Sequence, residues 1–192
     1  MTDVFSRITA GLPLVRSWVD DVVNEHAARA IRASELDFGR LDGYFSEAVL
    51  QGTRVASVDR IPIPPLSSFG LPEFAAVEQM AVAGITFKDL CLIHQSLASE
   101  SVHFHELVHA VQWRALGVDD YMLTYAVGLL QYGYAQNPLE VVAYDLQSQF
   151  DRHLPAADAE AIITSEARRA RDAAHAQFRQ HGFPVPPPGG SS

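Results

Sequence analysis

The residue types best suited to chemistry stand together in the segment His105-Glu106-Leu107-Val108-His109. Histidines four residues apart lie on one face of a helix, with Cβ atoms about 5–6 Å apart, so both imidazoles can reach one metal ion. The carboxylate that follows the first histidine lies beside that face, where it can take a proton from an activated water. The spacing therefore predicts a helical metal site in which His105 and His109 are ligands and Glu106 is a general base.

The neighbours of this segment are uncharged: Val102-His103-Phe104 precede it and Ala110-Val111 follow it. A helix of this composition can be buried while its ligand face meets a cleft. The segment resembles the active-site helix of the zincin metallopeptidases, whose longer signature has Val or Thr three residues before the first histidine and an apolar residue two after the second. Val102 and Val111 occupy those positions. The resemblance implies a Zn²⁺-dependent hydrolase that acts on a peptide or protein substrate.

Catalytic zinc usually has three protein ligands and one open position, so a third ligand is expected downstream. The metzincin signature would continue with Gly and His where this chain has Gln112 and Ala115. The gluzincin branch instead takes a Glu from a second helix, and the resemblance implies that this residue is Glu140. Asn137 as N-cap and Pro138 at the first helical position predict that such a helix begins just before it.

Glu140 also has a purely structural interpretation. In the pattern Asn137-x-x-Glu140, the carboxylate can close a capping box by bonding back to the amide of the cap residue. Metal ligation would then need another acid. The remaining acids near the motif are Asp119, Asp120 and Asp145.

Peptide hydrolysis develops an oxyanion that needs a hydrogen-bond donor besides the metal. Tyr144 lies one helical turn beyond Glu140, and Tyr134 belongs to the glycine-containing turn before that helix. Both are candidate catalytic donors, and core packing is the alternative for each. Many gluzincins have an Asp four residues after the ligand Glu, whereas here that position is Tyr144 and Asp145 comes one residue later.

Composition agrees with a small soluble enzyme. The chain has 192 residues and is 48% hydrophobic, which predicts a single domain over residues 1–183. A Pro/Gly/Ser-rich tail, expected to be disordered, follows over residues 184–192. The net charge of −9, without a basic cluster, argues against nucleic-acid binding. No apolar run reaches the ~20 residues of a membrane span. A lone cysteine, Cys91, and a start unlike a signal peptide predict a cytoplasmic protein.

The patterning predicts an α+β, mostly helical, zincin-like fold with a small sheet beside the motif helix. The run 85–93, just upstream of the motif, is a candidate edge strand that would bind an extended substrate by β-augmentation, with a core strand as the alternative. The other expected strand covers residues 53–58. The expected helices cover residues 13–33, 41–51, 72–83, 99–116, 120–132, 137–154 and 156–181.

Two other classes of function remain open. A non-catalytic, zinc-binding regulatory or interaction domain could use the same ligands, but structural zinc usually fills four protein positions and favours cysteine. The chain has no cysteine near the motif, and the presence of Glu106 also favours catalysis. In a metal-free helical interaction protein, the motif would be accidental.

Overall fold

The computed structural model describes residues 4–155 and 158–185. It confirms a mostly helical α+β fold with a small mixed sheet. The helices are α1 (Val4–Ala27), α2 (Glu47–Gly52), α3 (Glu100–Leu116), α4 (Val118–Tyr132), α5 (Pro138–Asp151) and α6 (Ala159–Gln180). The strands are β1 (Ile31–Arg32), β2 (Arg54–Val58), β3 (Gly84–Phe87) and β4 (Leu90–His94).

The sheet has the strand order β1-β2-β4-β3. β2 runs parallel to β4, while β1 and β3 are antiparallel to their neighbours. The prediction of one strand over 85–93 is wrong, because the chain reverses at Lys88, whose φ is 59°. β3 and β4 therefore form a hairpin. Of these two strands, β4 lies inside the sheet and β3 lies at its edge.

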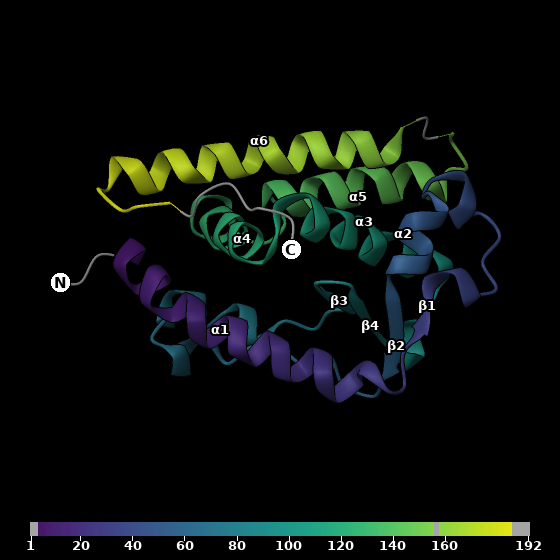
Figure 1. Cartoon of the computed structure of the whole chain (residues 1–192), viewed down its shortest axis with the longest axis horizontal. Helices are drawn as coiled ribbons and strands as arrows, with labels where there is room; N and C mark the ends of the chain where they lie inside the picture. The colour runs from purple at the N-terminus through teal and green to yellow at the C-terminus, as the bar shows by residue number, and fades with distance from the viewer. Residues whose placement is uncertain (1–3, 156–157, 186–192) are drawn as a thin grey trace.

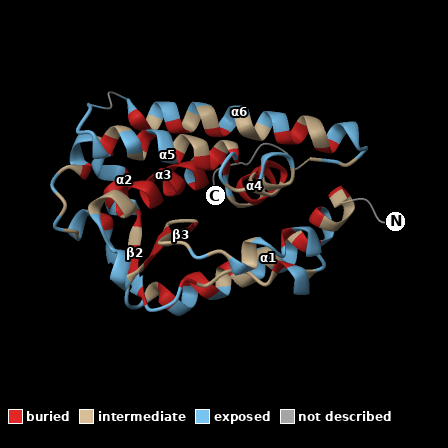
Figure 2. Ribbon diagram, turned by 180° about the vertical axis from the view of Figure 1, so that it is seen from behind, coloured by how far each residue is buried: buried red, intermediate tan, exposed pale blue. Residues whose placement is uncertain are grey.

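Helix α3 is the centre of the molecule. It packs against β3 and β4 on one side and against α5 and α6 on the other. Figure 1 shows α3 to α6 gathered together, with α1 running along the opposite side of the molecule. Figure 2 shows α3 almost wholly in the buried colour. Its apolar face stacks Phe104 on Phe150 of α5, with ring centroids 4.4 Å apart. The motif therefore lies in the interior and not on an exposed helix.

Two sharp turns bring the chain back past the motif helix. Gly117 separates α3 from α4 and has φ 76°, and Gly133 ends α4 with φ 72°. Residues that have a Cβ rarely adopt positive φ angles of this kind. Glycine therefore allows α4 to follow α3 without a longer loop. α5 then begins close to the middle of α3, which is where the second helix must lie if it is to contribute to a shared site.

Several predicted element bounds are wrong. α1 begins at Val4 and contains Pro13, which was expected at its start. Residues 72–83 form two short 3₁₀ turns, Pro72–Phe74 and Val77–Gln79, in place of a helix. The predicted helix over 41–51 is divided because Ser46, whose hydroxyl accepts from the amide of Val49, caps a new helix. In residues 41–51 and 72–83, a local cap or turn overrides the apolar periodicity.

The chain end is described only in part. Phe183 and Val185 pack against a hydrophobic cluster that includes Phe178. Residues 186–192 lie outside the described residues. Within the described part of the chain, no helix combines the length and the apolar character that crossing a bilayer demands.

Candidate metal centre

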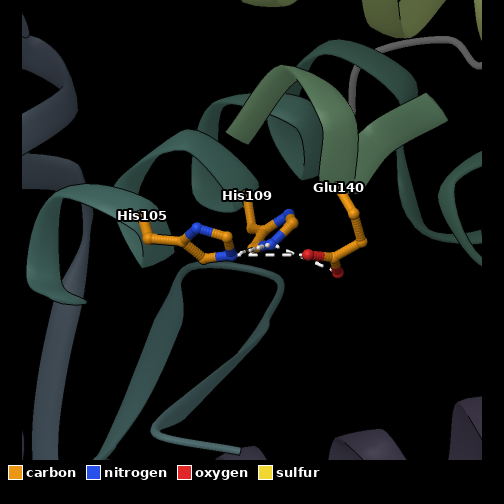
Figure 3. A group of neighbouring side chains, drawn as sticks. All are labelled: His105, His109 and Glu140. Carbon is orange, nitrogen blue, oxygen red and sulfur yellow. Dashed lines mark hydrogen bonds and ion pairs between the residues drawn. The ribbon is translucent and has the colours of Figure 1, made fainter. Parts of the chain in front are cut away.

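Three side chains converge from α3 and α5 (Figure 3). The Nε2 atoms of His105 and His109 are 3.1 Å apart. Nε2 of His105 is 3.4 Å from Oε2 of Glu140, and Nε2 of His109 is 3.5 Å from Oε1. These ligand atoms all lie within 4.8 Å of one another. The structure thus brings together the three residues predicted as metal ligands.

The N-terminus of α5 determines the direction of Glu140. Oδ1 of Asn137 accepts from the amide of Leu139 at 3.1 Å, so Asn137 is the predicted N-cap. The amide of Asn137 itself donates to the carbonyl of Tyr134 at 3.0 Å. That amide is therefore not bonded to Glu140, whose carboxylate lies against the histidines. The capping-box interpretation of Glu140 is wrong.

Gly128 in α4 permits this arrangement. A Cβ at position 128 would lie 2.5 Å from Oδ1 of Asn137. Nδ2 of Asn137 donates to the carbonyl of Tyr125 at 3.1 Å, which joins the start of α5 to α4. Gly128 was not predicted to matter for the site, although a glycine inside a helical pattern often marks a close approach of another segment.

Two glutamines fix the orientation of the histidine rings. Nδ1 of His105 donates to Oε1 of Gln147 at 3.0 Å, and Nδ1 of His109 donates to Oε1 of Gln112 at 2.9 Å. The amide of Gln112 donates in turn to the carbonyl of Leu139 at 2.9 Å. Because each Nδ1 holds a proton for its glutamine, the Nε2 of each ring in its neutral form presents a lone pair to the centre.

These glutamines were missed at the sequence level. Gln112 follows His109 by three residues and so lies on the ligand face of the helix, which was an available signal. Gln147 gave no such signal, because it lies on another helix. Its side-chain NH₂ donates to Oγ of Ser101 at 2.9 Å, which determines how its amide is turned.

The Glu140 carboxylate is buried and only partly hydrogen-bonded. The hydroxyl of Tyr125 donates to Oε1 at 2.7 Å. Oε2 has no hydrogen-bond partner, although Glu140 is 2% exposed. A buried carboxylate oxygen without a partner is costly, and a cation between it and the two Nε2 atoms would remove that cost. Two imidazoles and one carboxylate form a donor set that suits divalent metals, including catalytic zinc and non-haem iron.

Mutual charge effects shift the pKa values of the three groups. Burial raises the pKa of Glu140, but the imidazoles of His109 and His105 more than offset this and lower it below its ordinary value. Burial lowers the pKa of His109, but the charge of Glu140 and its hydrogen bond raise it, to about 9 overall. In the metal-free protein at neutral pH, His109 is therefore protonated beside an ionised Glu140.

Glu106 lies beside the centre without joining the ligand group. The hydroxyl of Thr86 donates to Oε2 of Glu106 at 2.7 Å. A Cβ at Gly84 would lie 2.7 Å from Oε1, so only glycine leaves room for this carboxylate against β3. Burial is the largest effect on the pKa of Glu106 and raises it, although His109 opposes the shift. Gly84 and Thr86, which hold the carboxylate from β3, were not predicted.

The two tyrosines proposed as oxyanion donors both lie near the centre. The ring of Tyr144 lies 4.6 Å from that of His105, centroid to centroid. The hydroxyls of Tyr144 and Tyr134 are 3.4 Å apart, and Tyr134 borders the cavity beside the metal site. Tyr121, whose hydroxyl is 3.5 Å from Nδ1 of His109, was not predicted.

The alternative acids lie elsewhere. Asp119 forms an ion pair with Arg16 at 2.9 Å, and Asp120 forms one with His175 at 2.8 Å. Asp145 is exposed. Among the described residues, His105, His109 and Glu140 form the one group of three that could hold a metal ion.

Comparison of the chain with protein families, with curated proteins and with solved structures found no match. The case for an activity therefore rests on the geometry of this centre.

Proposed function

We propose that the protein is a zinc-dependent metallopeptidase, a hydrolase of peptide bonds. The observation that carries the proposal is the convergence of two Nε2 atoms and a buried carboxylate oxygen that has no hydrogen-bond partner. His105, His109 and Glu140 would hold the ion. Zinc in such a donor set supplies a Lewis acid and a water of lowered pKa.

Glu106 is proposed as the general base. It is 4% exposed and borders the same cavity as the two histidines. Its hydrogen bond from Thr86 orients the carboxylate, and burial keeps its pKa above the ordinary value, which suits a group that both accepts and returns a proton. Glu106 would take the proton of the attacking water and pass it to the leaving nitrogen.

The edge strand β3 supports a peptide as substrate. The amide of His94 donates to the carbonyl of Ala83, so the next pair, Gly84 and Ile93, is a non-hydrogen-bonded pair. The backbone groups of Gly84 therefore point away from β4, next to Glu106. A substrate strand that paired there would lie beside the proposed base. Farther along, the carbonyl of Thr86 accepts from Nε1 of Trp113 at 3.0 Å, which would limit the pairing to the Gly84 end.

Tyr134 and Tyr144 are the proposed donors to the oxyanion. Their hydroxyls approach each other at the side of the centre where Tyr144 packs on His105. Tyr144 is 44% exposed, so its hydroxyl can turn toward a bound substrate.

The test compares metal content and peptide cleavage in the same preparations. The wild-type protein should retain about one zinc per chain after dialysis and cleave members of a mixed peptide library, with products identified by mass spectrometry. Glu106→Gln should keep the zinc and lose activity by ~10²–10⁴-fold, the usual contribution of a general base. A protein that binds zinc but hydrolyses no amide bond would support the non-catalytic zinc-binding domain instead.

A further inference from the structure

The metal centre borders an apolar cavity. The cavity has a volume of about 170 Å³ and is bordered by α1, by residues 63–82 and by α4. An apolar cavity of about 150 Å³ in another protein stays dry and binds benzene, so this volume is large enough for a ligand. Chemistry at the centre does not require such a space, and its shape and lining therefore bear on the substrate.

The cavity is long. Its lining on α1 extends from Ile8 to Val19, which corresponds to about 16 Å at ~1.5 Å per residue. Part of the lining, including Val19, Trp113 and Met122, belongs to one hydrophobic cluster. Another part, with Ile8 and Phe74, belongs to a second cluster. A ligand that filled the cavity would therefore be extended and narrow, unlike a single compact ring.

The polar side chains of the lining come from only some of the elements that border the cavity. Every side chain that α1 and residues 63–82 contribute to the lining is apolar. The polar side chains of the lining, including Thr86, Tyr125 and Tyr134, belong to the elements that build the metal centre. A peptide backbone along the cavity would bury amide groups where the lining side chains offer no partner, at a cost of about 1–3 kcal/mol for each. An aliphatic chain has no such groups.

We propose that the substrate is an N-acylated peptide or amino acid whose aliphatic acyl chain occupies this cavity. This inference rests on the proposed function and specifies the bond that is cleaved. Water adds its oxygen to the acyl carbon, the bond from that carbon to nitrogen breaks, and the proton that Glu106 took from the water goes to the leaving amine. The products are a fatty acid and a free amino group.

Chain length is the variable that tests the inference. N-acyl-glycinamides with acetyl, hexanoyl, decanoyl and tetradecanoyl groups would be assayed for amine release with fluorescamine. Binding would be measured separately, by displacement of the fluorescent fatty acid cis-parinaric acid. Affinity should rise about fourfold per methylene until the cavity is full, and kcat/KM should rise with it.

Two substitutions among the lining residues change the size of the cavity. Ala126→Leu in α4 fills part of it and should weaken decanoyl binding by at least about tenfold, while the acetyl compound is unaffected. Ala173→Leu, at an exposed position of α6, is the matched control. It should change the binding of neither the decanoyl nor the acetyl compound. Leu129→Ala enlarges the cavity and should shift the optimum to a longer chain, which keeps the test valid if Ala126→Leu does not fold.

The outcomes separate this inference from the proposed function. Cleavage of ordinary peptides without any effect of acyl length would overturn the acyl assignment and leave the peptidase intact. A peptide with Phe or Leu that displaces the probe as well as the decanoyl compound would also overturn it, in favour of an apolar residue. Length-dependent binding without cleavage of any amide would refute the hydrolase and, with it, the substrate role of the acyl chain.

Discussion

A histidine binds a metal ion through the ring nitrogen that carries no proton, so the group on the other nitrogen determines whether it can bind at all. In this protein both Nδ1 atoms meet a glutamine carbonyl oxygen, at 2.9 and 3.0 Å. Both Nε2 atoms are thereby turned to the same point as the Glu140 carboxylate. At the scale of single residues, the site depends on five side chains, of which three would touch the ion.

The role of Glu140 can be tested by removing only its charge. Glu140→Gln should weaken zinc binding strongly, because a neutral amide replaces an anionic ligand. The stability of the metal-free helix should not fall through loss of a cap, since the amide of Asn137 donates to Tyr134 and not to Glu140. Zinc affinity would be measured by chelator competition and stability by thermal unfolding. Wild-type zinc affinity in Glu140→Gln would refute its assignment as a ligand.

Gln147 should act on the metal through His105. Gln147→Ala removes the acceptor of the Nδ1 proton, and outer hydrogen-bond partners of this kind are typically worth 10–100-fold in metal affinity. Gln149→Ala, two residues away on the same helix, is the matched control and should leave the affinity unchanged. Equal affinities of the two variants in a chelator competition would contradict the orienting role.

At the scale of elements, the site is built where helices α3 and α5 pack together beside strand β3. α3 supplies the histidines and Glu106, α5 supplies Glu140, and α4 holds the start of α5 through Asn137 and Tyr125. β3 touches the other side of Glu106 through Gly84 and Thr86. The proposed base is therefore positioned by the sheet, whereas the three candidate metal ligands are positioned by the helices.

This division predicts a separable effect of Gly84→Ala. The new Cβ would lie within 3 Å of the Glu106 carboxylate, which must move away. We expect zinc content to stay normal while hydrolysis falls by at least about tenfold, because a displaced base loses part of the ~10²–10⁴-fold it supplies. Gly39→Ala, where an added Cβ meets nothing within 4 Å, is the control. Loss of zinc from Gly84→Ala would mean that β3 also supports the ligands.

At the scale of the whole molecule, a bound ion would connect α3 to α5 and so stabilise the fold. At a free zinc concentration of 100 times Kd, the gain is about 2.7 kcal/mol. For a chain of this size that corresponds to a rise of roughly 5–11 °C in Tm. Excess EDTA should reverse the rise, and His109→Ala should not show it.

The rise in Tm that zinc causes should also depend on pH. Zinc must displace the proton of His109, whose pKa is about 9 in the metal-free protein. Raising the pH toward 9 removes that proton in advance, so the zinc-induced rise in Tm should be larger at pH 8 than at pH 6. Thermal unfolding with zinc and with EDTA at each pH measures this difference. A rise that shrinks with increasing pH would contradict the pairing of His109 with Glu140.

The spacing of residues within one helix was sufficient to predict much of this site. His105, Glu106 and His109 are close because they are one turn apart on α3, and the N-cap of α5 follows from Asn137 and Pro138. Local backbone geometry determines these relations, so they are readable from the sequence alone. The mostly helical α+β class followed from the same local patterns.

The remaining features of the site and of the fold depend on contacts between residues far apart in the chain. The position of Glu140 against the histidines, the pairing of Gln147 with His105 and the close approach of Gly84 to Glu106 depend on how α4, α5 and β3 pack on α3. The long apolar cavity arises where α1 meets α4 and residues 63–82. Apolar periodicity marks those side chains as buried, but only the packing of whole elements determines whether they meet one another or enclose a space.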